Sequence, residues 1–424
     1  MHIDETVDSK IGSYSSAKLE NDLRVVVCCR PKTCSFSWAV SIKAGSQDGK
    51  PHLAHLVEHL TCRNMEKMNR HSGFANAFTG VERTQYFSTG HAEDLGDAIE
   101  SLVKIFQPLR AKPQRVKEEL RILQREKAEN GGISEMLCEA QGLVIGGDAM
   151  AKKYRASRRR LRSLLPLDAE DCNSFHERHY RTGNSRLTLI SPLPAQEILG
   201  RIQLALKTEY ATGAEPPEPT LAPPARRRLI WHYYPNTSAT FCVWHNHPAE
   251  SLAQRSCLQF ANRILGGQGR LHDSIRTKNQ IAYGVYSNVS RLDDQLSHSI
   301  LINSKITKVN KTIHLVAAEL DLINKAMPTD KFQLEINNCC RNLDLLEEDL
   351  YGLSEWLRRW NSNSASLVTP MQLRKTMQAM TPDSFAGWAS SFFQPKNRDA
   401  YLARNFGPIG WLTARRFAKG QFAN

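Results

Sequence analysis

Residues 52–60 read His-Leu-Ala-His-Leu-Val-Glu-His-Leu, and both the fold and the chemistry of this chain can be inferred outward from them. An α-helix turns by about 100° per residue, so His55, Glu58 and His59 fall on one face. The leucines and the valine of this stretch form an i, i+3, i+4, i+7 stripe on the opposite face. We therefore predict an amphipathic helix over residues 53–64 that buries its apolar face and presents two imidazoles and a carboxylate together.

The polar face of this helix has the composition of a metal site. Histidines at positions i and i+4 can bind one tetrahedral zinc ion, and Glu58 beside them can take a proton from a zinc-bound water. The order His-Leu-Val-Glu-His over residues 55–59 is that of an inverted zinc-protease motif. A motif this short also arises by chance, so an ordinary histidine–glutamate cluster on a surface helix is the alternative.

A second predicted helix, residues 113–129, offers a third ligand. Glu119 and Glu126 lie two turns apart on it, with Ile122 and Leu123 between them on the same face. Two carboxylates on an otherwise apolar face would be costly to bury unpaired, and a metal or a histidine held by a metal would offset that cost. We predict that Glu126 binds the metal and that Glu119 supports a ligating histidine. Salt bridges on an amphipathic helix are the alternative.

The length of 424 residues suits two domains of about 200 residues each. Residues 214–228 are rich in proline and end in three arginines. Clustered prolines disfavour both helices and central strands, so this segment indicates a linker. We predict an N-terminal metal-binding domain at 1–213 and a C-terminal domain at 229–424. Strand-like and helix-like segments do not alternate strictly, which favours an α+β fold. We expect strands at 23–27, 36–42, 240–244 and 299–303, and helices at 93–106, 251–265 and 308–323.

The net charge of +13 makes a nucleic-acid partner the first interpretation to consider. The excess is concentrated around residues 155–162, 226–228 and 415–416, and no aromatic residues interleave with these clusters. We therefore favour solvated surface, with no nucleic-acid partner. Attraction of acidic peptides is a third interpretation.

The cysteines and the N-terminus indicate a reducing, cytoplasmic location. Ten cysteines are spread along the chain without a CxxC pair or a regular framework. The first residues are polar and partly acidic, so we identify no signal peptide. No run approaches the roughly 20 uninterrupted apolar residues that span a bilayer, so we expect no membrane partner.

Four ordered motifs resemble those of the insulinase-like zinc peptidases, a family that includes pitrilysin, insulin-degrading enzyme and the mitochondrial processing peptidase. Residues 44–60 resemble the approach to the family's zinc helix, and residues 119–126 resemble its third-ligand helix. Residues 73–79 and 84–86 are similar to its substrate-edge strand. Residues 276–283, Arg-Thr-Lys-Asn-Gln-Ile-Ala-Tyr, resemble its Arg–Tyr substrate-binding motif. The length is that of a half-size member.

The resemblance implies two similar α+β domains, each a mainly antiparallel sheet covered by helices, and a peptidase activity that depends on Zn²⁺. It implies that a peptide substrate adds as a strand beside Asn76 and Ala77. Arg276 and Tyr283 would bind a substrate carbonyl oxygen and help to hold the tetrahedral intermediate.

The half-size length implies an assembly of two chains. In double-length members the Arg–Tyr motif comes from the half without zinc, so Arg276 and Tyr283 of one subunit would serve the zinc of its partner. We expect a homodimer that encloses a chamber; a heterodimer with a related subunit is the alternative. General peptide degradation and the processing of one small peptide precursor would use the same site.

The sequence also departs from the family pattern. His52 stands where a glycine usually precedes the zinc helix, and Cys62-Arg63-Asn64-Met65 replaces the usual segment after that helix. These differences concern the shape of the pocket and not the ligands.

Two other classes of function compete with the peptidase. One is a non-catalytic subunit that binds peptides or scaffolds a complex, although such members typically lose a ligand or the catalytic glutamate. The other is a nuclease, because His245-Asn246-His247 spells a short HNH motif. Two same-face histidines on a β-strand explain that motif more simply.

Overall fold

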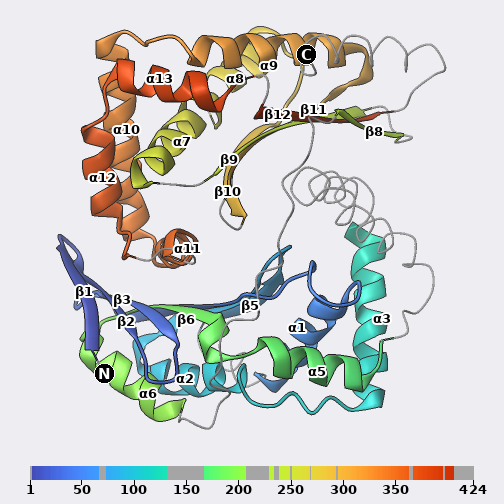
Figure 1. Ribbon diagram of the computed structural model, residues 1–424, viewed down its shortest axis with the longest axis vertical. Coiled ribbons are helices and arrows are strands. Elements are labelled where there is room, and N and C mark those ends of the chain that lie inside the picture. The colour runs from blue at the N-terminus through green and yellow to red at the C-terminus, as the bar shows by residue number, and fades with distance from the viewer. Residues whose placement is uncertain are drawn as a thin grey trace. The chain divides into compact units, whose positions relative to one another are not determined.

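The computed structural model describes residues 2–65, 73–130, 167–206, 229–233, 238–248, 251–267, 269–292, 295–361, 366–394 and 397–404. The chain divides into two compact units, and each holds one sheet covered by helices (Figure 1). The first unit comprises Met1–Asn130, Lys153–Thr220 and Asp344–Met371, and the second comprises the remaining residues. The predicted α+β class is confirmed.

The first unit is built on a seven-stranded sheet in the order β1-β2-β3-β7-β4-β6-β5. Its strands are β1 (His2–Ser9), β2 (Gly12–Lys18), β3 (Arg24–Cys29), β4 (Ser35–Ile42), β5 (Phe74–Thr79), β6 (Thr84–His91) and β7 (Ser185–Ser191). Only β3 and β7 pair in parallel, and the other neighbours are antiparallel. β5 lies at one edge of the sheet, next to β6.

One face of this sheet carries the main core of the first unit. Alternate strand residues such as Val25, Trp38 and Leu189 are buried there against helical leucines and isoleucines. The covering helices are α1 (Leu53–Asn64), α2 (Leu95–Lys104), α3 (Pro113–Asn130), α5 (Ala169–His179) and α6 (Ala195–Ala205), with short turns η2 (Ala92–Asp94) and η3 (Thr182–Asn184). α1 packs against α3, α5 and β5, which places it beside the sheet edge.

The opposite face of the sheet is covered by a late segment of the chain. α11 (Leu350–Asn361) packs on β4 and β7, and its Leu353 and Leu357 are buried with Tyr14. The Tyr14 hydroxyl donates a hydrogen bond to Glu347 at 2.8 Å. The sequence assigned all of residues 229–424 to the second domain; residues 344–371 instead complete the core of the first unit. The predicted linker at 214–228 lies outside the described residues.

The second unit has a five-stranded sheet in the order β10-β11-β9-β12-β8. Its strands are β8 (Leu229–Tyr233), β9 (Ser238–Pro248), β10 (Val285–Leu292), β11 (Gln295–Lys305) and β12 (Arg398–Arg404). Its helical segments are α7 (Leu252–Leu265), α8 (Arg270–His272), η4 (Asp273–Lys278), η5 (Ile306–Lys308), α9 (Val309–Ile323), most of α10 (Thr329–Glu348) and of α12 (Pro370–Gln378), and α13 (Pro382–Phe392). β8 and β12 are parallel, and the other described pairs are antiparallel.

The two sheets share one topology. The order β3-β7-β4-β6-β5 in the first unit has the same pattern as β8-β12-β9-β11-β10 in the second, with one parallel pair at the same place. In both units a helix follows the central strand of this pattern, α1 after β4 and α7 after β9. The similar order of elements expected from the sequence is therefore present in the strand pairing itself.

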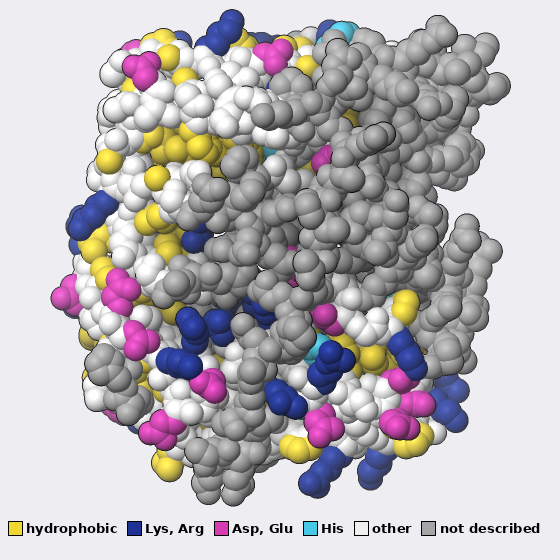
Figure 2. Space-filling view, in the orientation of Figure 1, with side chains coloured by type: hydrophobic (Ala, Val, Ile, Leu, Met, Phe, Trp, Pro, Cys, Tyr) yellow, Lys and Arg dark blue, Asp and Glu magenta, His cyan; other side chains and the backbone are white. Residues whose placement is uncertain are grey.

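Local predictions agree with the observed elements where the hydrophobic period is strong. The helices expected at 53–64, 251–265 and 308–323 correspond to α1, α7 and α9, with ends that agree to within one residue. The described surface in Figure 2 shows basic and acidic side chains interspersed. The three arginine clusters noted in the sequence lie outside the described residues. Among the described helices, none has both the length and the apolar composition that a membrane span requires.

Candidate metal centre

α1 brings two histidines and a glutamate to the edge of the first unit. Its apolar residues are buried, whereas the side chains of His55 and His59 keep 30% and 14% of their accessible surface. The residue before the helix, His52, has φ 67° and ψ −2°, a left-handed conformation that glycine adopts most easily. A glycine, which the family resemblance led us to expect here, would adopt this conformation without the strain that a histidine side chain adds.

Two imidazole nitrogens and one carboxylate oxygen converge between α1 and α3. The Nε2 atoms of His55 and His59 are 3.2 Å apart, and Oε2 of Glu126 lies 3.8 Å and 3.6 Å from them. Zinc–ligand bonds of 2.0–2.2 Å at tetrahedral angles would separate neighbouring ligand atoms by about 3.3–3.5 Å. The three atoms therefore have the spacing and the N, N, O chemistry of a zinc site with a fourth position for water or substrate.

The two glutamates of α3 differ in burial. Glu119 is 2% exposed, whereas the Glu126 side chain keeps 42% of its surface. The cost of burial that the sequence raised for both carboxylates therefore applies mainly to Glu119, which is paired with His59 and Arg63. Glu126 reaches the histidines from the solvent side, and Glu119 lies behind them.

Glu119 orients His59 and is itself held by an arginine. Its Oε2 atom lies 3.2 Å from Nδ1 of His59, and its Oε1 atom accepts a bond from Nε of Arg63 at 2.6 Å. A hydrogen on Nδ1 that points to Glu119 leaves the Nε2 lone pair free for a metal. Sequence reasoning did not assign this role to Arg63; its position four residues after His59, on the same helix face, was the available signal.

Glu58 is buried beside the cluster and bonded from a strand. It is 6% exposed, and its Oε2 atom accepts a short hydrogen bond from the Thr79 hydroxyl on β5. Burial raises the pKa of the Glu58 carboxyl, and the Thr79 bond and the nearby His59 partly oppose that shift. A carboxylate with a raised pKa is a stronger base. Thr79 was not identified from the sequence, because nothing local connects residues 58 and 79.

The predicted substrate residues Asn76 and Ala77 lie on β5, the edge strand that contacts α1. Asn76 is exposed, and its Oδ1 atom accepts the backbone N–H of Ala77 at 2.8 Å. Ala77 is partly buried against the core. An edge strand next to a metal cluster can accept an added strand. In the absence of such a strand, the Asn76 side chain accepts the Ala77 backbone N–H.

Arg276 and Tyr283 lie together in the second unit. The Arg276 guanidinium lies 4.2 Å from the centre of the Tyr283 ring, and Tyr283 is 82% exposed. An exposed aromatic ring under a guanidinium is a cation–π pair, which holds both groups in one orientation. The two residues of the predicted Arg–Tyr motif are therefore in contact with each other, and the Tyr283 ring is accessible from outside the second unit.

The HNH segment does not have the surroundings of a nuclease site. His245 lies on β9, is fully buried, and packs against His298 and Phe393. Burial lowers the pKa of His298 to about 3 and holds the pKa of His245 well below its usual value, so both imidazoles are neutral. The interpretation as strand histidines agrees with this geometry.

The sequence matches two models of one peptidase family. The model described as "Insulinase (Peptidase family M16)" matches residues 24–132, which include His55, Glu58, His59 and Glu126. The model described as "Peptidase M16 inactive domain" matches residues 166–339, which include Arg276 and Tyr283.

Relatives of similar length support the same assignment. An "Uncharacterized zinc protease" of Streptomyces coelicolor is 22% identical over 346 residues, covering 76% of this chain and 74% of that protein. One of Rickettsia felis is 19% identical over 416 residues, covering 93% and 98%. The crystal structure of a protease from Helicobacter pylori superposes with a TM-score of 0.76 at 15% identity, covering 93% of this chain and 100% of that one. At that identity the structural likeness concerns the fold.

Proposed function

We propose that this chain, which belongs to the insulinase (M16) family of peptidases, is a zinc-dependent endopeptidase. The observation that carries the proposal is the convergence of the two Nε2 atoms and the Glu126 oxygen beside the buried carboxylate of Glu58. His55, His59 and Glu126 would hold the metal. Zinc in such a site supplies a Lewis acid that polarises a carbonyl and lowers the pKa of water.

The protein groups divide the remaining tasks. Glu58 takes the proton from the attacking water and returns it to the leaving amine, and burial raises its pKa, which makes it a stronger base for the first step. Thr79 holds one carboxylate oxygen of Glu58 and leaves the other for the water. Glu119 and Arg63 keep His59 in the orientation and tautomer that a ligand needs.

The substrate is a peptide that extends the first sheet. Backbone hydrogen bonds to β5 would hold it along Asn76 and Ala77, which accounts for binding without strict dependence on sequence. Arg276 and Tyr283 would bind a peptide carbonyl, and the positive guanidinium would stabilise the charge that develops on that oxygen. The stacked Arg276–Tyr283 pair supports this role.

Zinc content and hydrolysis of a mixed peptide library test the activity. Glu58→Gln should keep one zinc per chain and lose about 100- to 10,000-fold in hydrolysis, because an amide cannot accept the proton. Glu118→Gln, an exposed glutamate on α3, is the matched control and should behave as wild type. Wild-type protein that binds zinc but cleaves no peptide would instead support a non-catalytic peptide-binding subunit.

We also propose a dimer with composite sites. Both motif sets occur in one chain of 424 residues, and C2 pairing is the commonest assembly. Mixing inactive Glu58→Gln with inactive Arg276→Ala should restore activity, because each mixed dimer contains one site with both defects and one site with neither. If the subunits exchange and no activity returns, or if the monomer is active, composite sites are wrong.

A further inference from the structure

A row of three aromatic rings begins at the β5 edge of the first sheet. The ring centre of Phe74 on β5 lies 5.9 Å from that of Phe87 on β6. The Phe87 ring centre lies 5.6 Å from that of Tyr351, in the first turn of α11. These separations are typical of aromatic rings in contact. The three rings therefore form one cluster, the aromatic row, which joins the edge strand to a helix packed on the same sheet.

The aromatic row is accessible although its rings are large and apolar. Phe74 is 53% exposed, Tyr351 is 43% exposed, and Phe87 between them is half-buried. Along β5 the exposed positions alternate with Ala75 and Ala77, which pack against the main core. Phe74 therefore points to the sheet face opposite that core. Exposed apolar side chains that touch one another mark binding surfaces, whereas single ones are ordinary.

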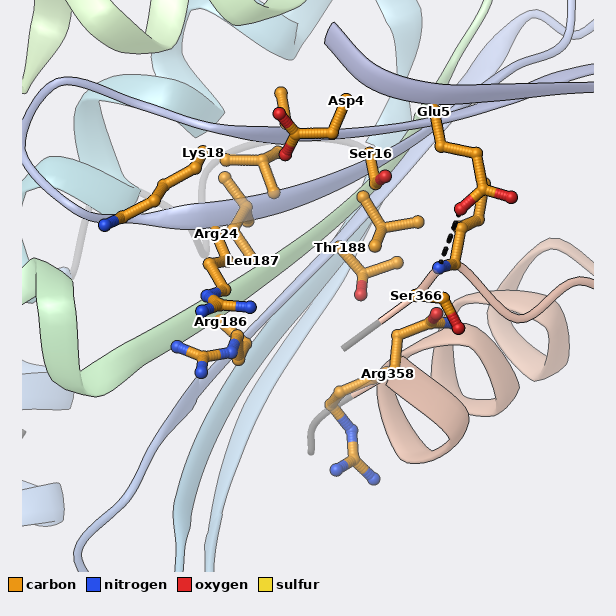
Figure 3. A pocket seen from close by; sticks show the side chains of 15 residues that line it. Asp4, Glu5, Ser16, Lys18, Arg24, Arg186, Leu187, Thr188, Arg358 and Ser366 are labelled. Atoms are coloured by element: carbon orange, nitrogen blue, oxygen red, sulfur yellow. Dashed lines mark hydrogen bonds between the residues drawn. The ribbon is translucent and has the colours of Figure 1, made fainter. Parts of the chain in front are cut away.

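The same sheet face is charged on the other side of α11. Because α11 packs on β4 and β7, β5 and β6 lie on one side of it and β1, β2 and β3 on the other. On that other side, charged side chains line a cavity of about 400 Å³ (Figure 3). Its Lys18 is paired with Asp22 at 2.7 Å, and its Arg358 with Glu355 at 2.7 Å. An apolar side chain of a ligand is therefore favoured at the aromatic row over this cavity.

The aromatic row lies at a set distance along β5 from the metal cluster. Thr79, the last residue of β5, donates a hydrogen bond to Glu58, and Phe74 is the first residue of the same strand. At a rise of about 3.3 Å per residue, the two positions are about 17 Å apart. An added strand has the same rise, so a peptide residue opposite Phe74 would lie roughly four to six positions from the bond at the metal.

We infer that the aromatic row selects peptides with an aromatic or large aliphatic side chain roughly four to six residues from the cleaved bond. This selection rests on the proposed peptidase function and on addition of the substrate to β5. In an added strand, the side chain directly opposite Phe74 points to the same face, with the two Cβ atoms about 5 Å apart. That side chain would cover the exposed Phe74 ring, which Phe87 and Tyr351 support from the other side.

The direction of the added strand decides on which side of the cleaved bond this residue lies. β5 runs from Phe74 toward the metal end at Thr79. Antiparallel addition therefore puts the selected residue on the C-terminal side of the bond, and parallel addition puts it on the N-terminal side. Both directions bring a side chain of the peptide against Phe74.

Kinetics on matched peptides test the selection. The starting peptide is one that the wild type cleaves at a single bond, with serine at every position away from that bond. A phenylalanine is then moved one position at a time along both sides. At the best position, kcat/KM should rise about tenfold over the serine peptide, mainly through a lower KM, because the contact is the same in the ground state and the transition state. Lysine at that position should give no comparable gain.

Substitutions in the aromatic row should change the preference itself. Its measure is the ratio of kcat/KM for the phenylalanine peptide to kcat/KM for the serine peptide, taken within each variant. Phe74→Ala should cleave the two peptides equally, and Phe74→Glu should prefer lysine at the same position. Tyr351→Ala should lower the ratio less, because Tyr351 acts through Phe87. Leu204→Ala removes a 75% exposed side chain from α6 and should keep the wild-type ratio.

Binding separates this selection from the proposed activity. Zinc-loaded Glu58→Gln should bind a fluorescent phenylalanine peptide about tenfold more tightly than its serine counterpart, and adding Phe74→Ala should remove the difference. If the wild type cleaves no peptide, the same comparison uses peptides from the library; a preference that depends on Phe74 then supports the selection while the activity fails. If peptides are cleaved and no position of phenylalanine raises kcat/KM, the selection is wrong and the peptidase stands. A wild-type ratio in folded Phe74→Ala also overturns the selection, as does the absence of any preference in binding.

Discussion

The first and second units share a strand order and differ in what the helix after the central strand does. α1 and α7 both begin with Leu-Ala. At the third, sixth and seventh helical positions α1 has His55, Glu58 and His59, whereas α7 has Gln254, Cys257 and Leu258. One topology thus carries a candidate metal centre in one unit and an amphipathic helix without these ligands in the other, so the difference lies in the side chains and not in the fold.

The third position shows the difference most directly. Gln254 closes a capping box, in which it accepts the backbone N–H of Ser251 and donates its own N–H to the Ser251 hydroxyl. α1 has no side-chain cap, begins at the left-handed His52 and turns His55 toward the other ligands. The N-terminus of α7 is therefore stabilised by its capping box, whereas α1 lacks a side-chain cap and buries the Glu58 carboxylate beside the candidate metal site.

Matched substitutions at the seventh position should have the largest and most contrasting effects. His59→Ala should lose zinc and about 1,000-fold or more of activity while the fold persists, because one of three ligands is gone. Leu258→Ala should keep zinc but destabilise the protein by about 2–5 kcal/mol, because Leu258 is fully buried. Metal analysis and denaturant unfolding of both variants would refute the contrast if the two showed the same pattern.

Removing the arginine behind Glu119 should weaken the metal centre without touching a ligand. Arg63→Gln takes away the 2.6 Å bond that holds Glu119, so His59 is less firmly oriented. We expect zinc affinity to fall by roughly 10- to 100-fold in competition with a chelator. Arg115→Gln, on the surface of α3, is the control. Equal zinc affinity in Arg63→Gln and wild type would remove Arg63 from the centre.

Removing the donor to Glu58 should change the pH dependence of hydrolysis more than zinc binding. The Thr79 bond lowers the pKa of Glu58 against the larger, opposite effect of burial. In Thr79→Val that pKa should rise further, and the base works only when ionised, so the acid limb of kcat/KM should move to higher pH. Zinc content should stay at wild-type level. An unmoved acid limb would contradict this account.

The buried histidines of the second unit should give the smallest effect, on acid stability. Burial keeps the pKa of His245 low in the folded state, whereas in the unfolded state His245 binds a proton near its ordinary pKa of about 6.5. Above that pH this histidine does not oppose folding. As the pH falls below it, the unfolded state gains a proton that the folded state does not, and the free energy of unfolding decreases. His245→Leu should make the loss of unfolding free energy between pH 6.5 and 5 shallower by up to about 1.4 kcal/mol per pH unit. Chemical unfolding with chelator present measures this slope, and an unchanged slope would exclude the histidine.

The amino-acid order was sufficient for features that depend on neighbours in the chain. The spacing of the apolar residues in 53–64 predicts α1, because helical geometry alone places them on one face. The same geometry places His55 and His59 together on the other face. The fold class follows from two similar sets of such segments. Glu126 was predicted as the third ligand from the two carboxylates on one face of residues 113–129 and from the family resemblance, whereas its contact with the histidines joins separate helices and needed the packing of α1 on α3.

Contacts between distant segments needed the packed structure. Three contacts join segments that lie far apart in the sequence: the Thr79–Glu58 bond, the Arg63–Glu119 bond and the packing of residues 344–371 in the first unit. The hydrophobic period of each segment predicts its secondary structure but not the segment that it will contact. Likewise, Lys18, Arg24 and Arg186 lie opposite one another only because β2, β3 and β7 pair in that register. Local propensity specifies elements, whereas burial and register, which depend on the whole core, specify which side chains meet.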